Sequence, residues 1–418
     1  MQAVVLAGGD SSRFYPYSKK AHKTMVKIMG KPILQHTLEG LKDAGIKDVI
    51  IRVKDDSVIE NYFGNGQKLG MTIRYISQKD ALGMGEVLLN AEKFLEGDFI
   101  FIGGNHVNSK DLVRELTSNK SEDSRGVVLV RERENVWDYG VAEIKDGKLV
   151  KVVEKPKKGE EPSKLCLVSA FLLPKDIIDV IKNIKMSEYN FEQEALSEYA
   201  KNNVLDVIAT KNEISTLKYP WDILSLKNLL MKSVKGLVSS GAKISKSAEI
   251  DDNVVIESGA QILEGVKIKG PAYIGKDVKV GTNSLIRSGT DLEENVSLGA
   301  FTEVKNSLIM EGTSIHSGFI GDSIIGQNCK IGSGFTTANK KIDRSNIEVT
   351  VRGKKVDTGL RAFGAIVGNS VTLGIKVSTM PGVIVGNNSV IGPSTSVFKN
   401  VSDDVTYYAK FQEIIEKK

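Results

Sequence analysis

The sequence predicts an α/β, Rossmann-like domain followed by a left-handed parallel β-helix, and two periodicities lead to this prediction. Before about residue 230, short apolar runs alternate with helical patterns, and from Ile244 onward an aliphatic residue recurs at every sixth position. Strands that alternate with helices are typical of a wound parallel sheet. A hexapeptide period is typical of a triangular β-helix, in which three hexapeptides make one coil.

The first half contains strand and helix patterns in the order that such a sheet requires. The runs QAVVLAGG (2–9) and DVIIRV (48–53) are apolar enough for buried strands. Between them, Pro32 opens a helical pattern whose apolar face is formed by Leu34, Leu38 and Leu41. We predict another buried strand at 99–102, which a Gly-Gly pair ends with bare backbone.

A helical pattern joins the two halves. In YPWDILSLKNLLMKSV (219–234), Pro220 suits a first helical turn. Apolar side chains recur on one face of this helix at Ile223, Leu224, Leu226, Leu229 and Leu230. We therefore divide the chain into an α/β domain over 1–218, a connecting helix within 219–238, a β-helix over 239–403, and a tail over 404–418 that is expected to form a capping helix.

The six-residue period is the strongest pattern in the chain. At 41% hydrophobic composition, the chance that eleven consecutive sixth positions are aliphatic is below about 1 in 10,000. These positions are Ile244, Ile250, Ile256, Ile262, Ile268, Ile274, Val280, Ile286, Leu292, Leu298 and Val304. The period is disturbed after Val304 and resumes at Val367, and the alternating segment 346–359 between them predicts a protruding hairpin.

Composition and charge exclude several classes of protein. The net charge of +5 comes from interleaved lysines and glutamates, which is not the pattern of a nucleic-acid surface. The two cysteines, Cys166 and Cys329, are too far apart for a disulfide scaffold or a metal motif, which fits a reduced, cytoplasmic compartment. We predict neither a signal peptide nor a membrane span, because no apolar run approaches about 20 residues.

A glycine-containing loop follows the first strand. Gly8 and Gly9 can offer backbone N–H groups to phosphate oxygens, while Arg13 and Lys23 can offset the charge of a triphosphate. With this opening, LAGGDSSRFYPYSKKAHKTMVKIMGKPIL (6–34), the chain resembles the sugar-1-phosphate nucleotidylyltransferases. Because a β-helix follows, nearly the whole chain is similar to the archaeal form of the bifunctional uridylyltransferase/acetyltransferases of UDP-N-acetylglucosamine synthesis.

The resemblance implies roles for individual residues of the first half. It assigns nucleotide binding to Gly8, Gly9, Arg13, Lys23, Gln78 and Gly83, and sugar contacts to Gly140 and Glu154. From the residue pattern alone, Gly140 is a turn glycine and Glu154 a member of a surface ion pair. Several positions depart from the family: Ser11 replaces a loop glycine, His22 and Thr24 replace prolines beside the lysine, Met84 replaces a threonine, and Ser169 replaces an asparagine.

The metal ligands of the family have no counterpart in this sequence. The resemblance places one Mg²⁺-binding carboxylate after the strand at 99–102 and an acid or amide near 216, where this chain has Gly104 and Thr216. Mg²⁺ requires oxygen ligands and neutralises the charge of the attacked phosphate. Asn105 could supply an amide oxygen after a register shift, His106 is a poor ligand, and Asp10 and Asp80 are the nearest acids. We expect impaired or lost nucleotidyl transfer, with Mg²⁺ needed only if transfer is retained.

The second half keeps more of the chemistry that the resemblance implies. It assigns sugar-phosphate binding to Arg287 and Lys305, general-base catalysis to His316 and sugar positioning to Asn339, with acetyl-CoA as acyl donor. A histidine with a pKa near 6.5 can accept the proton of an attacking amine. Arg287 and Lys305 are 18 residues apart, which is the length of one coil, so we expect them to stack on adjacent coils. Phe319 replaces a tyrosine, Ser317 and Gly318 replace the usual residues, and Ala362 replaces a lysine.

Our hypothesis is a two-domain protein of nucleotide-sugar biosynthesis. Its β-helix would acetylate an amino-sugar 1-phosphate, and its first domain would bind a nucleotide or nucleotide sugar. The resemblance implies a homotrimer. Two alternatives stay open: an active nucleotidylyltransferase with unusual metal ligands, and a non-catalytic regulatory or sensor subunit that partners an active paralogue.

Overall fold

The computed structural model describes all residues of the chain except 10, 20–21, 55–56, 78–82, 185–190, 413 and 417–418. It forms two compact units. The first comprises Met1–Asp10 and Pro32–Ile214, and the second comprises Ser11–Lys31 and Ser215–Lys418. The units therefore differ from the predicted domain ranges, because the segment Ser11–Lys31 groups with the β-helix. None of the helices formed by the described residues is long and apolar enough to cross a membrane.

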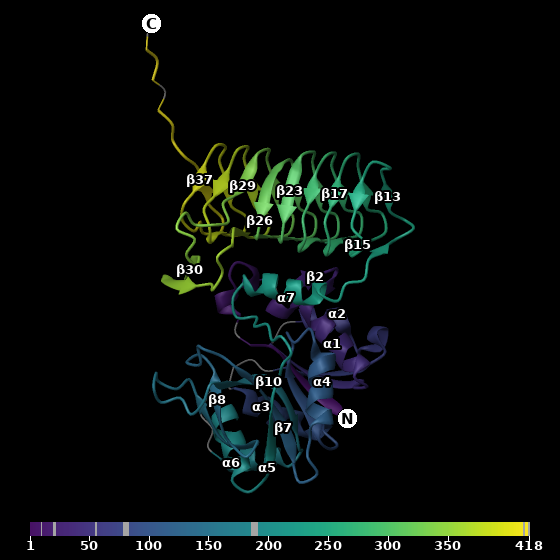
Figure 1. Ribbon diagram of the computed structural model, residues 1–418, viewed down its shortest axis with the longest axis vertical. Helices are drawn as coiled ribbons and strands as arrows, with labels where there is room; N and C mark the ends of the chain where they lie inside the picture. The colour runs from purple at the N-terminus through teal and green to yellow at the C-terminus, as the bar shows by residue number, and fades with distance from the viewer. Residues whose placement is uncertain are drawn as a thin grey trace. The chain divides into compact units, whose positions relative to one another are not determined.

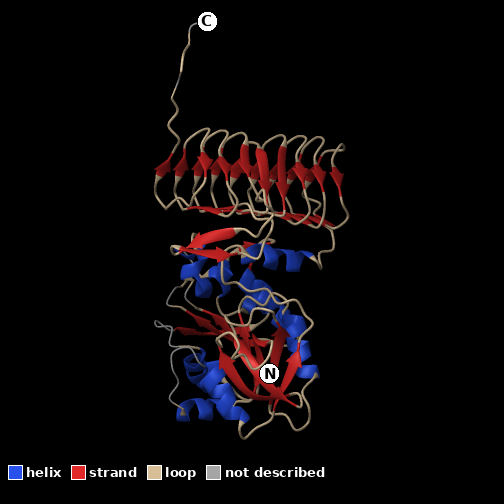
Figure 2. Ribbon diagram, turned by 60° about the vertical axis from the view of Figure 1, so that its left-hand side comes forward, coloured by secondary structure: helices blue, strands red, loops and turns tan. Residues whose placement is uncertain are grey.

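The first unit is built on a nine-stranded mixed sheet with the order β5-β4-β1-β6-β10-β7-β11-β9-β8 (Figures 1 and 2). Its strands are β1 (Gln2–Ala7), β4 (Asp48–Val53), β5 (Thr72–Ser77), β6 (Phe99–Gly103), β7 (Gly126–Glu132), β8 (Gly140–Lys145), β9 (Lys148–Glu154), β10 (Leu165–Leu173) and β11 (Leu205–Ala209). Strands β5, β4, β1 and β6 run parallel, and β10 is antiparallel to β6 and β7. The predicted Rossmann-like half is thus confirmed.

Helices flank this sheet (Figure 2). They are α1 (Ile33–Asp43), α2 (Val58–Phe63), α3 (Met84–Ala91), α4 (Ser109–Ser118), α5 (Ile177–Asn183) and α6 (Ser197–Ala200), with short turns η4 (Gln67–Leu69), η5 (Glu92–Phe94) and the π-helical η6 (Phe191–Leu196). Pro32 precedes α1 as predicted, and the expected apolar face is buried at Leu34, Leu38 and Leu41. Strand β6 is completely buried, as the run of aromatic and branched residues predicts.

The second unit is a three-sided parallel β-helix (Figure 1). The first sheet contains β12 (Leu237–Val238), β15 (Val254–Ile256), β18 (Ala272–Ile274), β21 (Thr290–Leu292), β24 (Leu308–Ile309), β27 (Ile324–Ile325), β32 (Ala365–Val367) and β35 (Val383–Val385). The second contains β13 (Lys243–Ile244), β16 (Gln261–Ile262), β19 (Lys279–Val280), β22 (Ser297–Leu298), β25 (Ser314–Ile315), β28 (Lys330–Ile331), β33 (Thr372–Leu373), β36 (Val390–Ile391) and β38 (Thr406–Tyr407). The third contains β14 (Glu249–Ile250), β17 (Lys267–Ile268), β20 (Leu285–Ile286), β23 (Thr302–Lys305), β26 (Gly318–Gly321), β29 (Phe335–Thr337), β34 (Ser378–Thr379) and β37 (Ser396–Val397).

The predicted hexapeptide positions fill the interior of this β-helix. From Ile256 to Val304 every one of them is buried, whereas Ile244 is 36% exposed and Ile250 is only partly buried. These two lie in the first coil, which has no preceding coil to cover it. Ile244 nevertheless pairs in register with Ile262, so it keeps its place in the repeat although the end of the β-helix leaves it exposed.

The structure explains the disturbed period after Val304. Up to Ile286 each core position pairs with a residue 18 positions later. Leu292 and Leu298 then pair with residues 17 positions later, and Val304 pairs with Ile320, 16 positions later, so the spacing shortens by one residue and then by two. Ile325 then pairs with Val367, because an insertion separates two neighbouring coils. The insertion carries the predicted hairpin, formed by β30 (Glu348–Val351) and β31 (Lys354–Asp357).

The expected capping helix in the tail is absent. Within the described part of 404–418, the regular structure is strand β38, and the chain beyond it extends without a helix (Figure 1). The apolar side chains of the tail are exposed, at 70% for Phe411, 76% for Ile414 and 90% for Ile415. A short amphipathic segment gains helical stability mainly from packing its apolar face, and this segment has none.

The segment Ser11–Lys31 packs on the β-helix. It forms the 3₁₀ turns η1 (Ser12–Phe14), η2 (Tyr17–Lys19) and η3 (Lys23–Met25) and then β2 (Lys27–Ile28), which pairs with β3 (Lys31–Pro32). The Tyr17 hydroxyl donates to the Val367 carbonyl at 2.8 Å, and Asn387 donates to the Pro16 carbonyl at 2.9 Å. These contacts are the reason that the segment belongs to the second unit.

Two buried carboxyl groups of the first sheet hold the end of this segment. Asp291 accepts the Met29 N–H, and Glu293 accepts the Gly30 N–H, each at 2.9 Å. The second oxygen of each carboxyl group, Asp291 Oδ1 and Glu293 Oε2, is buried and has no hydrogen-bond partner. Burial raises the pKa of Asp291 to about 7, and burial together with the nearby Asp291 charge raises the pKa of Glu293 well above its usual value.

The predicted connecting helix is α7 (Asp222–Met231), within the second unit. Its Lys227 is completely buried and donates to the Asn228 side chain at 2.8 Å and to the Gly289 carbonyl. Burial lowers the pKa of Lys227 to about 8, although Asp291 and Asp322 act in the opposite direction. The helix therefore presents a cation to the β-helix as well as an apolar face.

Candidate functional site

The loop after β1 is shaped partly by packing. Gly8 lies against the end of β4, where an added Cβ would overlap the Arg52 guanidinium and the Lys54 backbone nitrogen, so only glycine fits. Gly9 has open space around its Cα and leaves its backbone accessible. Of the two predicted phosphate-binding glycines, Gly8 is thus also required by the packing of the loop against β4.

The structure divides the other nucleotide-binding candidates between the two units. Arg13 lies in η1 with an exposed side chain, and Lys23 begins η3 with a half-buried one, both in the second unit. Gly83 caps α3 at a φ of +97°, a conformation that favours glycine. Gln78 lies outside the described residues, as do the acids Asp10 and Asp80.

The two predicted sugar contacts are brought together. Gly140 begins β8, Glu154 ends β9, and the two residues are direct cross-strand partners. The Glu154 carboxylate forms an ion pair with Lys155 at 3.3 Å, while its backbone N–H donates to Gln193 at 2.8 Å. Both a sugar contact and a surface ion pair are therefore compatible with this position.

The predicted metal positions do not fit a Mg²⁺ ion. At Gly104 an added Cβ would lie 2.9 Å from the Leu6 carbonyl oxygen and 3.1 Å from Leu34 Cδ1, so a carboxylate has no room there. Thr216 instead donates its hydroxyl to Asp222 at 3.2 Å. The described residues contain no group of three or more His, Cys, Asp or Glu side chains that could hold a metal.

The position after Gly104 is the one that sequence reasoning underrated. Asn105 is half-buried and is the first residue beyond β6 whose side chain is partly accessible. His106 is buried and bonds to the Ser169 backbone, and burial lowers its pKa to about 4, so its ring is neutral. An amide oxygen at Asn105 and a neutral ring at His106 supply none of the negative charge that the ion needs.

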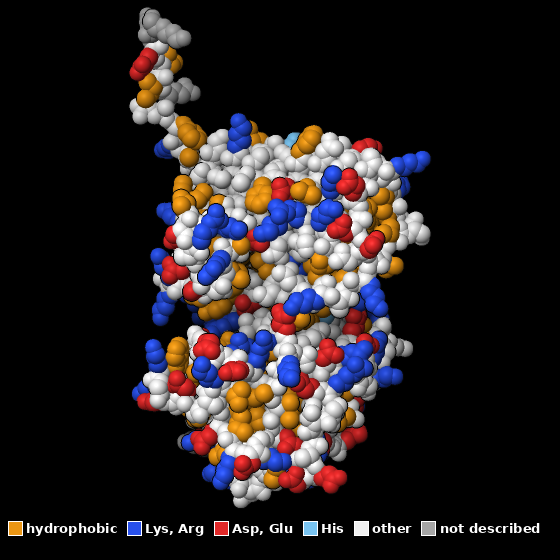
Figure 3. Space-filling model, in the orientation of Figure 1, with side chains coloured by type: hydrophobic (Ala, Val, Ile, Leu, Met, Phe, Trp, Pro, Cys, Tyr) orange, Lys and Arg blue, Asp and Glu red, His pale blue; other side chains and the backbone are white. Residues whose placement is uncertain are grey.

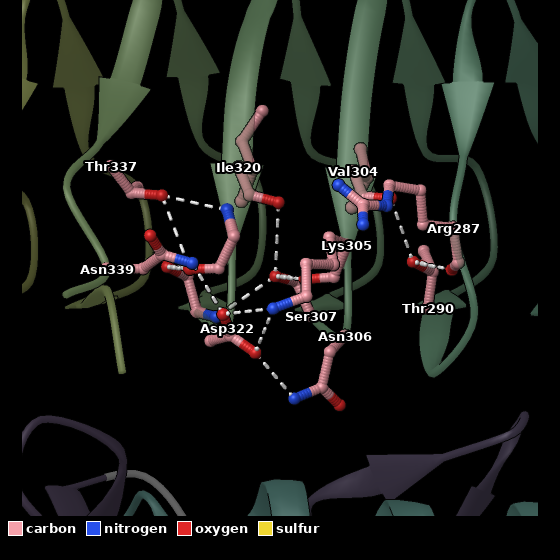
Figure 4. A network of polar contacts seen from close by, with 12 residues as sticks. Arg287, Thr290, Val304, Lys305, Asn306, Ser307, Ile320, Asp322, Thr337 and Asn339 are labelled. Carbon is pink, nitrogen blue, oxygen red and sulfur yellow. Dashed lines mark hydrogen bonds and ion pairs between the residues drawn. The ribbon is translucent and has the colours of Figure 1, made fainter. Parts of the chain in front are cut away.

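In the β-helix, Arg287, Lys305 and Asn339 share one corner (Figure 4). We call it the third corner: the residues that follow the third-sheet strands and lead to the next coil. Ile286 pairs with Val304, so the predicted stacking of Arg287 on Lys305 holds for the backbone. Asn339 follows β29, which lies in the same sheet.

The side chains at this corner meet different carboxylates. Arg287 pairs with Glu303 at 3.0 Å, and both side chains are exposed, at 47% and 36%. Lys305 pairs at 2.9 Å with Asp322, whose side chain is only 3% exposed. Asn339 donates to the same Asp322 carboxylate at 2.6 Å (Figure 4).

His316 lies on a different corner. It follows β25 of the second sheet and precedes β26 of the third, so the width of β26 separates it from the third corner of the same chain. Its exposed ring lines an open pocket of about 550 Å³ together with Lys330, Ser333 and Ile375. A single chain therefore does not bring the predicted base next to the predicted phosphate ligands.

Two further residues follow from the geometry. Phe319, which replaces the family's tyrosine, lies with Asn339 against Gly321: a Cβ there would be 2.7 Å from Phe319 Cζ and 2.9 Å from Asn339 Nδ2. Asp322, one residue later, was missed by the sequence reasoning. The sequence signal is an acid directly after a third-sheet strand. The structure gives this residue a φ of +50°, which Asp and Asn tolerate better than most residues.

The surface charges agree with the interleaved sequence pattern. On the face drawn in Figure 3, Lys and Arg side chains alternate with Asp and Glu over both units. The corner with Arg287, Lys305 and Asn339 is therefore defined by its local partners rather than by a broad field of one sign.

Fold and site together define a sugar-nucleotide type of transferase: a nucleotidyltransferase-like α/β unit and a left-handed hexapeptide β-helix. The profile of the nucleotidyl transferase family matches residues 2–221. Within the β-helix, the profile of the GMPPB C-terminal domain matches 268–377, and that of the hexapeptide repeat of succinyl-transferase matches 364–393.

Full-length relatives specify the family. Bifunctional protein GlmU of Methanococcus maripaludis is 33% identical over 422 residues, which cover 100% of both chains. The bifunctional sugar-1-phosphate nucleotidylyltransferase/acetyltransferase of Sulfurisphaera tokodaii is 32% identical and covers 96% of this chain and 98% of its own. The low-salt glycan biosynthesis nucleotidyltransferase Agl11 of Haloferax volcanii is 29% identical over 80% of this chain and 94% of its own. The chain belongs to the bifunctional sugar-1-phosphate nucleotidylyltransferase/acetyltransferase family.

Proposed function

We propose that the β-helix transfers an acetyl group from acetyl-CoA to the amine of an amino-sugar 1-phosphate. The observation that carries this proposal is the third corner. Arg287 and Lys305 lie there on consecutive coils, and Asn339 lies two coils after Lys305. An arginine and a lysine suit a phosphate, and an amide suits the hydroxyl groups of a sugar.

In this reaction the amine nitrogen attacks the thioester carbonyl, and the C–S bond then breaks. His316 accepts the proton of the attacking amine, and the coenzyme A thiolate leaves and takes up a proton. Arg287 reaches the sugar phosphate by turning away from Glu303, which costs little because that pair is exposed. Lys305 and Asn339 stay in place beside Asp322.

The proposal includes a homotrimer. Within one chain, β26 separates His316 from the third corner, so the two would act on one substrate most directly if neighbouring copies faced each other. This arrangement would also give acetyl-CoA, a long substrate, a groove between two copies.

For the first unit we propose binding of a nucleotide or nucleotide sugar with impaired or lost nucleotidyl transfer. The support is the poor fit of the metal positions. A side chain at Gly104 would collide with Leu6 and Leu34, the Thr216 hydroxyl donates to Asp222, and the Asn105 side chain carries no charge. Gly9 and the pair Gly140 and Glu154 remain as binding candidates within this unit. Without the charge of a metal ion, the pyrophosphate leaving group lacks its main stabilisation.

The test is to incubate the full-length protein with acetyl-CoA and either glucosamine 1-phosphate or galactosamine 1-phosphate, and to follow the release of free thiol. We expect His316→Ala to lower the rate at least about a hundredfold, the usual contribution of a general base. His36→Ala, on α1 of the other unit, is the matched histidine control and should leave the rate unchanged.

The outcomes separate the candidate functions. Thiol release that depends on His316 supports the acetyltransferase. Magnesium-dependent release of pyrophosphate from a nucleoside triphosphate and a sugar 1-phosphate would instead show an active nucleotidylyltransferase. If neither product forms, the non-catalytic subunit of an active paralogue becomes the better hypothesis.

A further inference from the structure

Asp322 is a buried carboxylate of the β-helix that accepts several hydrogen bonds. Its side chain is 3% exposed, and it accepts hydrogen bonds from Lys305 at 2.9 Å, Asn306 at 2.8 Å and Asn339 at 2.6 Å. Figure 4 shows these donors converging on it from both sides along the third corner. Asp322 follows β26, whereas Lys305 ends the strand before and Asn339 follows the strand after. One buried carboxylate therefore joins three consecutive coils.

The charge of Asp322 is offset from two directions. Lys305 forms the direct ion pair, and the buried Lys227 of α7 lies close enough for Asp322 to act on its pKa. Asn306 connects them, because its amide nitrogen donates to Asp322 while its oxygen accepts from Lys227 at 3.2 Å. A buried carboxylate with this many donors holds its partners far more tightly than an exposed one does.

The position of Asp322 limits what it can do. With 3% of its side chain exposed, it does not reach a ligand, so it acts through the side chains that it holds. A free lysine samples many rotamers, and ordering it on binding costs roughly 1.5–2 kcal/mol of side-chain entropy. The Lys305 ammonium has three donors, and those that are not used by Asp322 remain for a phosphate oxygen.

We propose that Asp322 is a positioning residue of the acetyl-transfer site, which fixes the Lys305 ammonium and the Asn339 amide where they meet the sugar phosphate. This inference rests on the proposed function, because it assigns Lys305 and Asn339 to the binding of that substrate. It gives the two neighbouring cations different tasks: Lys305 is fixed before the substrate arrives, and Arg287 turns to it afterwards.

The chain contains a matched control for this proposal. Asp251 and Lys269 occupy the same corner in earlier coils and form an ion pair at 3.2 Å, but their side chains are 40% and 51% exposed. An exposed pair of this kind contributes little. Asp251→Asn and Asp322→Asn thus make the same chemical change in an exposed and a buried lysine pair.

The experiment measures two quantities on the full-length protein: steady-state thiol release, and binding of glucosamine 1-phosphate by titration calorimetry. We expect Asp322→Asn to raise KM and Kd for the sugar phosphate roughly tenfold to a hundredfold, since a charged hydrogen-bond partner is lost. KM for acetyl-CoA should stay within about twofold. Asp251→Asn should match the parent in every measurement.

The two readouts keep this proposal separate from the proposed function. If Asp322→Asn changes both KM values equally, or only lowers the melting temperature, Asp322 is merely structural and the inference is overturned. If the parent binds the sugar phosphate without turnover, acetyl transfer fails as the function, yet weaker binding by Asp322→Asn still supports the positioning role. If the parent shows neither binding nor turnover, both proposals are overturned.

Discussion

The two units differ in whether their candidate site positions hold charged side chains. In the β-helix, Arg287 meets Glu303 and Lys305 meets Asp322, so each predicted cation has an opposite charge close by. In the α/β unit, the predicted metal position Gly104 has no room for a side chain. The difference teaches that the charged candidates of the β-helix have ionic partners, whereas the described residues of the α/β unit place no carboxylate at the predicted metal position.

The largest effect is expected where that charge is missing. Asn105→Asp places a carboxylate at the first partly accessible position after β6. Because the ion stabilises the leaving group, we expect Mg²⁺-dependent pyrophosphate release to rise on the order of a hundredfold over the parent. The measurement is pyrophosphate production from UTP and a sugar 1-phosphate, with and without Mg²⁺.

The control for this gain is Asn108→Asp, in which the same change is made at a residue that donates to the Glu213 carbonyl. It should leave pyrophosphate release at the level of the parent. Equal rates for the two variants would mean that a missing carboxylate after β6 does not limit the first unit, and the contrast between the units would disappear.

The next effect tests the exposed cation of the β-helix. Arg287→Ala removes the guanidinium that we assign to the sugar phosphate, and we expect KM for that substrate to rise about thirtyfold, the usual loss for a charged hydrogen bond. Lys269→Ala, one coil earlier on the same corner, should change it less than twofold. An equal loss in both variants would point to a general electrostatic effect of the corner and against a specific contact.

The smallest effect concerns the stability of the second unit against pH. Above pH 4.5, its ordinary pKa, folded Glu293 keeps a proton that its unfolded form releases, because burial raises its pKa in the folded state. The folded state then binds more protons, so the free energy of unfolding falls as pH rises, by at most about 1.4 kcal/mol per pH unit for one proton. Glu293→Gln imitates the protonated group and should flatten this slope.

The measurement is chemical denaturation at several pH values in that range, followed by a signal from the β-helix. Glu294→Gln, the next residue, pairs with Lys276 at the surface and should keep the slope of the parent. A variant at Glu293 that loses stability with pH in parallel with the parent would show that folded Glu293 does not hold a proton in this range.

The sequence was most informative where structure is repetitive. The sixth positions from Ile256 to Val304 are buried as predicted, because each coil repeats the environment of the one before. The same rule fails at the ends: Ile244 is exposed because no coil covers it, and the tail around Phe411 has no apolar partner and forms no helix. Local pattern predicts an element, but only a neighbour can stabilise it.

The sites were less predictable for a related reason. The spacing of 18 residues placed Arg287 beside Lys305, whereas Asn339 was assigned only through the resemblance to a family. It gave no sign that Asp322 would be buried beneath two of them. Nor could it show that β26 separates His316 from them.

What the sequence by itself determined is the sum of its local patterns: two halves, a period of six and a loop suited to phosphate. What only the tertiary structure decided is which side chains meet. Residues 11–31 precede most of the α/β unit, yet they pack on the β-helix, where the carboxyl groups of Asp291 and Glu293 accept their backbone N–H groups. The physical reason is that such bonds join residues more than 250 positions apart, and no local pattern encodes the distance between them.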